Sequence, residues 1–442
     1  MKQFKIFLVT LVALALAAPA YSAVNVKMKG DFQNYFQYSN NAQFYQSLDT
    51  KKDSDDDDFR YNARVRLTWI AEDDEKKVRG TLGTEWDITA GQGGGTRNGP
   101  GGNFEGDRTN FELRFAYLDF ELPFDHATRV YMGLQPAGMN EWIFCDNAMG
   151  VRLERGFGDW EAAIGWFRND TLASGDINAD KAEYADLVTL DVAWNINEGN
   201  KIAAFAYYMD DGTTYNGLAS NDSLPVLTSF DENDSVQVYW LGLSGAMEVG
   251  SFFGSATGAY QGGKAHTAED GSGDADIKAW MATGEFGVNI NKAYVKVGGL
   301  YMSGDDKEDD KVENFFGIDT DNTLIGSVAL LEFWDPTGDY AFYGPQLGRW
   351  GARHLYAHAG YEINDKTDVR VGALWFNADE KIDGERNLGY EFNGEVNYKI
   401  TKNLTAGLAA GYLIGDDAWD KLADDGDGDD LWKVISRFRY RF

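Results

Sequence analysis

The stretch 59–69 contains three arginines, Arg60, Arg64 and Arg66, all at even-numbered positions. Every odd-numbered position of that stretch is apolar. Because successive side chains of a β-strand point to opposite faces, the three guanidinium groups would share one face as a ladder. Fixed positive charges beside a narrow wet passage attract anions and exclude cations. The further arginines expected on neighbouring strands are Arg79, Arg114, Arg129 and Arg152.

Two carboxylates could oppose this ladder. Glu141 and Asp146 lie in the polar stretch 136–149. If that stretch faces the arginines, the opposite charges would set up a transverse field across a passage. Another interpretation also stays open, in which the arginines line a wide solvated wall or pair with carboxylates, since like charges this close need compensation. The carboxylates available for such pairing are Glu85, Asp87 and Glu112.

The sequence gives little support for catalysis. His354 and His358 would share one strand face, but their spacing separates them by about 13 Å, too far for one metal ion. A Gly-x-Ser-x-Gly nucleophile motif does not occur. The single cysteine, Cys145, excludes an internal disulfide and is expected to be a small packed residue. We therefore predict no enzyme, no catalytic residue, no metal site and no cofactor.

The charge balance is strongly acidic, with a net charge of −31 over 442 residues. Phosphate binding needs net positive charge, so nucleic acid is not an expected partner. Acidic runs at 319–322 and 424–430 have the oxygen density of a calcium loop, although neither matches an EF-hand. A solvated acidic loop and a loop-bound divalent cation remain the two interpretations.

The N-terminus has the pattern of an export signal. Lys2 and Lys5 precede an uncharged apolar run over 6–18, and small residues follow up to Ala23. This pattern predicts a signal peptide over 1–23, with an N-terminal membrane anchor as the alternative. The remaining residues, 24–442, contain no apolar run of the ~20 residues that a spanning helix needs. They form a single predicted domain.

Alternation with period two continues along that domain. In the stretch 388–400 the even positions are mostly apolar and the odd positions polar, as in 59–69 with the parity reversed. A soluble β-sandwich would alternate in the same way, so the lengths of the connections between strands must distinguish the two folds. Short joints such as 401–403 alternate with long polar stretches, among them 304–351 and 378–387. Short periplasmic turns and long extracellular loops are typical of an outer-membrane barrel.

We therefore predict an all-β fold, a transmembrane antiparallel β-barrel of about 18 strands, with 16 as the alternative. Its outer face must be apolar, because an arginine at the bilayer centre costs roughly 2–4 kcal/mol. The arginines are consequently expected inside. The aromatic residues expected in interfacial girdles on the outside include Trp69, Tyr117 and Trp432.

The last strand carries the most specific signal. Phe438, Tyr440 and the terminal Phe442 share one face, while Arg437, Arg439 and Arg441 share the other. This ending resembles the C-terminal recognition strand of bacterial outer-membrane barrels. The resemblance implies that the three aromatics form an assembly signal read by the barrel-assembly machinery. Closing the barrel requires this strand to pair with the first.

The whole domain resembles a trimeric bacterial porin. The stretches 116–120 and 129–136 are similar to the strand pair before the third loop in the homotrimeric porins of sulfate-reducing bacteria. The resemblance implies a homotrimer in the outer membrane, among lipid and lipopolysaccharide. It also implies a water-filled channel with an inward-folded third loop, so that the pore-lining residues would include Arg60, Arg64, Arg66, Arg79, Arg114, Arg129, Glu141 and Asp146.

Three functions compete at this point. The first is passive diffusion of small hydrophilic solutes with a bias toward anions. The second is a saccharide-selective channel that uses lumenal aromatics. The third is a structural or adhesive barrel with a plugged lumen. The tyrosines at possible inward positions for the second function are Tyr131, Tyr207, Tyr239 and Tyr356.

Overall fold

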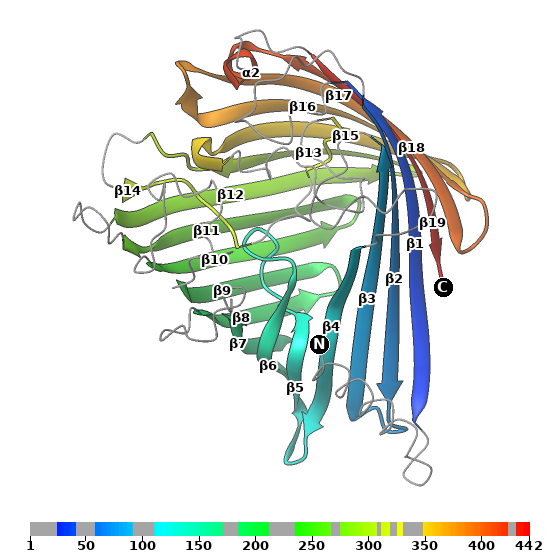
Figure 1. Ribbon diagram of the computed structural model, residues 1–442, viewed down its shortest axis with the longest axis vertical. Coiled ribbons are helices and arrows are strands. Elements are labelled where there is room, and N and C mark those ends of the chain that lie inside the picture. Colours follow the sequence, from blue (N-terminus) through cyan, green and yellow to red (C-terminus); the bar gives the residue numbers. More distant parts are fainter. Residues whose placement is uncertain are drawn as a thin grey trace.

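The computed structural model describes residues 24–40, 58–91, 110–170, 184–211, 235–266, 275–306, 311–318, 325–329, 348–422 and 430–442. The predicted signal peptide, 1–23, and most of the acidic runs lie outside these ranges. Over them the chain forms one antiparallel sheet that curves round until it closes on itself (Figure 1). None of the described helices is long and apolar enough to cross a membrane.

Eighteen long strands form the barrel. They are β1 (Asn25–Ser39), β2 (Asp58–Glu72), β3 (Val78–Gly91), β4 (Asn110–Leu122), β5 (Asp125–Pro136), β6 (Asn147–Phe157), β7 (Trp160–Asp170), β8 (Tyr184–Asn197), β9 (Asn200–Asp211), β10 (Ser235–Val249), β11 (Phe252–His266), β12 (Ala275–Ile290), β13 (Ala293–Met302), β15 (Ala352–Asn364), β16 (Thr367–Ile382), β17 (Glu385–Lys399), β18 (Leu404–Gly415) and β19 (Leu431–Arg441). The two-residue β14 (Lys311–Val312) pairs with the end of β12, while β13 pairs directly with β15. The sheet's nineteen strands thus include eighteen in the ring, as the connection lengths predict. Among the described residues, short helices occur at η3 (Gly348–Trp350) and α2 (Asp417–Leu422).

The first and last strands close the ring. β1 pairs antiparallel with β19 from Asp31 opposite Arg441 to Ser39 opposite Lys433. Beyond this ladder, the backbone amide of Phe442 donates to the carbonyl of Gly30 at 3.1 Å, and the amide of Gly30 donates back at 3.0 Å. The Phe442 ring fills the space above Gly30, where a Cβ atom would lie 2.2 Å from the ring. Closure leaves no strand edge of the ring unpaired, as a strand assembly in hydrocarbon requires.

Connections sort by length between the two ends of the barrel. At one end, which we name the turn end, consecutive strands join through short turns such as 158–159, 198–199 and 291–292. At the other, the loop end, most connections are long. The predicted long loop 378–387 is wrong: β16 and β17 continue to a two-residue turn at Asp383 and Gly384. Both residues have positive φ, at 48° and 100°, which is the geometry of a tight hairpin.

The two faces of the strands differ sharply. On β10, Val238 and Trp240 are fully buried, whereas Leu241 and Leu243 are 48% and 64% exposed. The exposed apolar side chains recur on every strand of the ring, on the face away from the lumen. Tyr239 belongs to this outer face, and the prediction that it points inward is wrong.

One residue expected in the outer girdle lies inside. Tyr117 pairs across the sheet with Thr81 and Gly133, on the same face as the neighbouring Asp119, which is fully buried inside. Its ring lies 6.3 Å from that of Tyr131, also inward. The girdle prediction failed here because strand-end aromatics occur on both faces.

Candidate pore constriction

Arg64 and Arg66 lie on the inner face of β2, opposite two carboxylates of β3. The register pairs Arg64 with Asp87 and Arg66 with Glu85. Arg64 donates to Asp87 through Nε and Nη2, both at 2.7 Å, and its Nη2 lies 2.9 Å from Glu85 Oε1. Arg66 donates from Nε to the same Glu85 carboxylate. Together the two arginines thus pair with Glu85 and Asp87, as the alternative interpretation expects, and their role at a constriction stays a prediction.

A β-bulge brings a third arginine to the same carboxylate. The β3–β4 register shifts between Gly83 and Thr84, which adds one residue to β4 near Arg114. The Nε of Arg114 lies 3.2 Å from Glu85 Oε2, so its side chain points inward. The ring of the following residue, Phe115, covers Gly83, and a Cβ atom on Gly83 would lie only 2.1 Å from that ring.

The arginines cover the carboxylates that hold them. The side chains of Glu85 and Asp87 are 5% and 12% exposed, against 29% for Arg66 and 25% for Arg114. Three guanidinium groups contact Glu85 and Asp87, and a third carboxylate, Glu112, lies opposite Glu85 in the β3–β4 register. Solutes would meet the more exposed guanidinium groups, while the buried acids fix the positions of these side chains.

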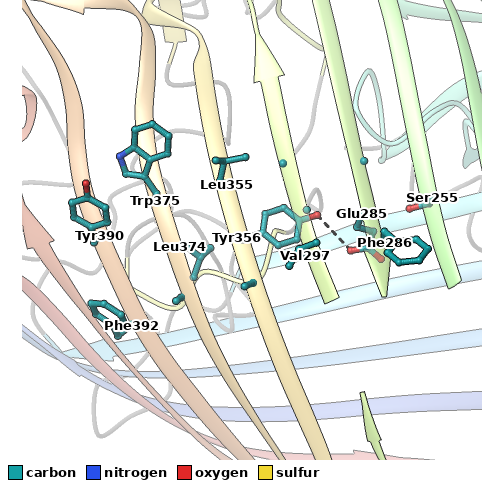
Figure 2. A pocket seen from close by; sticks show the side chains of 15 residues that line it. Ser255, Glu285, Phe286, Val297, Leu355, Tyr356, Leu374, Trp375, Tyr390 and Phe392 are labelled. Carbon is teal, nitrogen blue, oxygen red and sulfur yellow. Dashed lines mark hydrogen bonds between the residues drawn. The ribbon is translucent and has the colours of Figure 1, made fainter. Parts of the chain in front are cut away.

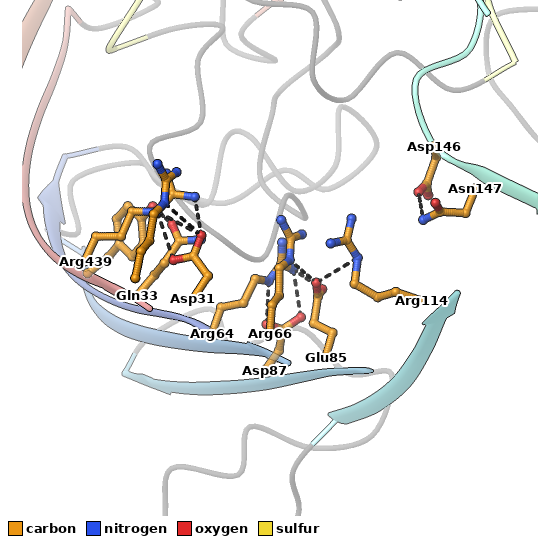
Figure 3. A network of polar contacts seen from close by, with 12 residues as sticks. Asp31, Gln33, Arg64, Arg66, Glu85, Asp87, Arg114, Asp146, Asn147 and Arg439 are labelled. Carbon is orange, nitrogen blue, oxygen red and sulfur yellow. Dashed lines mark hydrogen bonds and ion pairs between the residues drawn. The ribbon is translucent and has the colours of Figure 1, made fainter. Parts of the chain in front are cut away.

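Arginine side chains also line the inner wall where the barrel closes. Arg439 on β19 donates from Nε to Asp31 Oδ1 on β1 at 2.9 Å, and Arg441 donates to the same carboxylate at 3.3 Å. Figure 3 shows Asp31 and Arg439 beside the β2–β4 cluster. We name Arg64, Arg66, Arg114 and Arg439 the arginine row. The sequence showed an arginine face on the last strand but did not place it beside β2.

Arg79 and Arg129 lie farther toward the turn end. Both bind Asp119, whose side chain is fully buried, with the Arg79 Nε at 2.8 Å from Oδ2. Arg129 also reaches the carbonyl of Lys76 in the 73–77 turn, at 3.5 Å. They line the inner wall, but at its turn end rather than beside the third loop. The backbone of Arg60 lies on β2 opposite Gln37, and its side chain is outside the described part.

The third connection at the loop end, residues 137–146, folds into the barrel as predicted (Figure 1). Its side chains Trp142, Ile143 and Phe144 are buried against the inner wall, contributing about 1.5–3 kcal/mol each. The amide of Asn140 donates to the Tyr207 hydroxyl at 2.9 Å. We name residues 137–146 the third loop.

A glycine lets the third loop pass over another arginine. Gly138 has a φ of +68°, and a Cβ atom there would lie 2.3 Å from Nη1 of Arg152. Arg152 on β6 is the remaining arginine of the predicted set. It forms an ion pair with Glu154, and it lies under the loop rather than in the open lumen.

A second segment enters the lumen, and the sequence analysis missed it. Residues 311–318 and 325–329, which we name the inner strap, pack inside the barrel. Trp240 Nε1 and Gln261 Nε2 donate to the carbonyl of Phe316 at 3.1 and 3.3 Å. At its other end, the amide of Val328 donates to Glu391 at 2.6 Å. Apolar residues inside a long polar loop, such as Phe315 and Val328, were the available signal.

The third loop and the inner strap support each other. The amide of Ile318 donates to the carbonyl of Ile143 at 2.6 Å. Together they cover the inner faces of β9 to β12, where Tyr207, Trp240 and Met281 are buried. The face that carries the arginine row lies on the other side of the lumen (Figures 1 and 3). The inner strap also reaches Glu391 on β17 and Gly411 on β18, so the two insertions narrow the lumen from β9 round to the strand beside β19.

The two carboxylates of the third loop have different neighbours. Asp146 lies across from Arg114 in Figure 3, and its charge acts on that guanidinium. Glu141 lies within reach of Glu285 on β12. Burial, with the charge of Glu285, raises the pKa of Glu141 above its usual range. Asp146 therefore fits the predicted transverse field, whereas the charge acting on Glu141 is another carboxylate.

The remaining sequence predictions concern metal ligands, two histidines, the acidic stretches and Cys145. Within the described ranges, no group of three or more His, Cys, Asp or Glu side chains is arranged to hold a metal ion. His354 and His358 do share the inner face of β15. The acidic stretch 319–322 and residues 424–429 lie outside the described part, so the loop-bound cation stays a prediction. Cys145 is partly exposed in the third loop.

A shallow groove of about 840 Å³ lies on the outer surface between β11 and β17 (Figure 2). Its rim consists of exposed apolar side chains, including Phe286, Leu355 and Phe392. Small residues such as Gly299 and Ala373 form its floor. This groove faces away from the lumen and is separate from the arginine row.

Comparisons with known proteins identify the fold. No family model matches the chain, and no curated protein matches it. Among solved structures, a BenF-like porin from Pseudomonas fluorescens aligns at 12% identity and a TM-score of 0.58, covering 95% of this chain and 99% of that one. OccAB4 of Acinetobacter baumannii aligns at 13% identity and a TM-score of 0.55, covering 94% and 98%. OccK9 (OpdG) of Pseudomonas aeruginosa aligns at 12% identity and a TM-score of 0.57, covering 95% and 99%.

These similarities show an 18-stranded barrel of the porin type. They do not confirm the narrower resemblance to the homotrimeric porins of sulfate-reducing bacteria. At these identities the alignments establish the fold, and the solutes of the aligned proteins do not transfer to this chain.

Proposed function

We propose that the chain is an outer-membrane porin, a water-filled channel for passive diffusion of small hydrophilic solutes with a bias toward anions. The turn end then faces the periplasm and the loop end the exterior. A passive channel needs no catalytic residue, metal ion or cofactor. The structural neighbours include a protein described as a porin, which supports this function.

The observation that carries the proposal is the asymmetry of the lumen. Solvated guanidinium groups of Arg66, Arg114 and Arg439 line one side, where a packed protein core would have apolar contacts. The third loop and the inner strap stand on the other side. A passage between them is lined by cations on one wall and meets Asp146 on the other. Such charges favour anions that follow the arginine row.

The acidic net charge of the chain is compatible with this bias. Many of the carboxylates lie in the loop-end stretches around 49–58, 304–321 and 415–430. Charges at an outer mouth are screened over about 8–10 Å at physiological salt. The carboxylates at the outer mouth therefore affect how ions approach the channel more than they affect the discrimination between anions and cations at the arginine row.

A plugged barrel is the principal competing function, because two segments already occupy the lumen. Planar-bilayer recording of the purified protein separates the two. A porin gives stepwise currents, and the proposed bias gives an anion-selective reversal potential in a salt gradient. Absence of conductance would favour the plugged barrel, and a cation-selective potential would reject the bias while leaving the porin.

Assembly as a homotrimer among outer-membrane lipid and lipopolysaccharide, after insertion by the barrel-assembly machinery, belongs to the same proposal. The sequence resemblance and the terminal Phe442 support it. Cross-linking in native membranes followed by mass measurement tests the trimer. Triplet closures in the recordings would agree with it, whereas a monomeric mass together with single-step closures would contradict it.

A further inference from the structure

The inner wall carries a second candidate site away from the arginine row. A cavity of about 370 Å³ opens near the turn end of β10 to β13. Its inward-facing side chains are Glu248, Phe253, Asn289, Tyr294 and Lys296. A cavity of this size is at the lower end of the range for small-molecule pockets. The arginine row does not contribute to it, so it is a separate place for a solute to pause.

Two aromatic rings form its apolar surface. The Phe253 ring lies over Gly287, where a Cβ atom would be 2.3 Å from Cζ. The Tyr294 ring lies over Gly360, where a Cβ atom would be 2.1 Å from Cε1. A ring over a glycine can lie flat on the backbone and turn its other face toward the cavity that both rings line. Both rings are only partly buried.

Ring-over-glycine pairs also stabilise strands, so the pairs alone do not make a site. Phe205 covers Gly242 in the same manner, but it is buried with its neighbour Tyr207 and lines no such cavity. What distinguishes Phe253 and Tyr294 is the open space between them and the polar groups that share it.

Those polar groups carry charges of both signs. Lys296 Nζ donates to Glu285 Oε2 at 2.8 Å. The Tyr356 hydroxyl reaches the same oxygen at 3.4 Å (Figure 2). The ammonium is thus already neutralised by a carboxylate. Asn289 adds an uncharged amide that both donates and accepts hydrogen bonds. With Glu248 in the lining, the site holds two carboxylates and one ammonium, so unlike the arginine row it does not select an anion.

We propose that this cavity binds a neutral, ring-shaped polyol, the chemistry of a pyranose sugar, as it leaves the channel. The C–H face of the ring packs on Phe253 and Tyr294. Its hydroxyl groups exchange hydrogen bonds with Asn289, Lys296 and Glu248, which supply both donors and acceptors. This inference rests on the proposed channel, because the solute must reach the turn end of the lumen.

The test uses maltose as the probe in planar-bilayer recordings of the purified protein. Maltose is added to the side facing the turn end, and the open-channel current is followed against concentration. We expect partial, saturable block, and a half-blocking concentration about fivefold to tenfold higher in Phe253→Ala and in Tyr294→Ala. Phe286→Ala, which removes an exposed ring on the outer face of β12, is the matched control and leaves block unchanged.

Asn289→Ala keeps both rings and should weaken block by a smaller factor. A current that falls in proportion to viscosity without saturating, as with glycerol, would overturn the inference. Equal block in wild type and both ring variants would overturn it as well. In either case anion-selective conductance would leave the proposed channel standing, whereas a protein that conducts no ions would reject the channel itself.

Discussion

Replacing Arg66 and Arg114 together with glutamine tests the arginine row in the most informative way. Both side chains are more exposed than the carboxylates that they contact. Arg64 stays in place to bind both Glu85 and Asp87, so neither buried acid loses all its partners. The double variant should therefore fold. Substituting Arg64 itself would strand Asp87 in the wall, where an unpaired buried charge is costly.

The size of the effect follows from Coulomb's law. An anion passing about 6 Å from a guanidinium group in water gains roughly 0.7 kcal/mol. Screening at physiological salt reduces this to roughly 0.35 kcal/mol. A cation is repelled by the same amount, so one charge changes the free-energy difference between the two ions by about 0.7 kcal/mol. Each arginine thus accounts for about a threefold preference, and the pair for about tenfold.

Reversal potentials in a potassium chloride gradient measure this preference directly. We expect the ratio of chloride to potassium permeability to fall about tenfold in the double variant. Arg168→Gln is the matched control, because Arg168 pairs with Asp186 on the outer face near the loop end. An unchanged potential in a double variant that still conducts would refute the reasoning and remove both residues from the constriction.

Three further predictions concern the inner strap, closure and pH. Gln261→Leu removes both hydrogen bonds between Gln261 and the Phe316 backbone, so the inner strap should move more and the noise of the open-channel current should rise. Current noise equal to that of the wild type would contradict a strap held by Gln261. Deleting Phe442 should lower the folded fraction on heat-modifiability gels, while Phe442→Tyr preserves it; equal folding would contradict the closure. Because the pKa of Glu141 is raised, its negative charge is lost at a higher pH than for an ordinary glutamate. As the pH is lowered, the anion preference of the wild-type channel should therefore begin to rise at a higher pH than an ordinary glutamate would give, and Glu141→Gln should lack this rise. Identical pH dependences of anion preference in the wild type and in Glu141→Gln would contradict the prediction.

The strands could be predicted because their signal is local. Alternation at 59–69 fixes which side chains share a face, and Arg64 and Arg66 lie on the inner face beside Asp87 and Glu85. The number of strands followed from connection lengths in the same way. The failure at 378–387 was also local: polar residues there suggested a loop, whereas Asp383 and Gly384 form a tight turn between two extended strands.

The site could be predicted only in part, because its remaining contacts join distant segments. Arg439 meets Asp31 across 408 residues, and only the closed barrel shows that the last strand extends the arginine row. The inner strap binds Trp240 and Glu391 from a loop without periodicity. Arg114 reaches Glu85 through a bulge that has no clear signature in the sequence.

Single-channel recording of the wild-type protein across a salt gradient tests the central idea most directly. A continuous aqueous path along the arginine row gives discrete ohmic steps and a reversal potential on the chloride side. A membrane that stays silent after verified insertion of folded protein, or steps that reverse on the potassium side, would contradict the account.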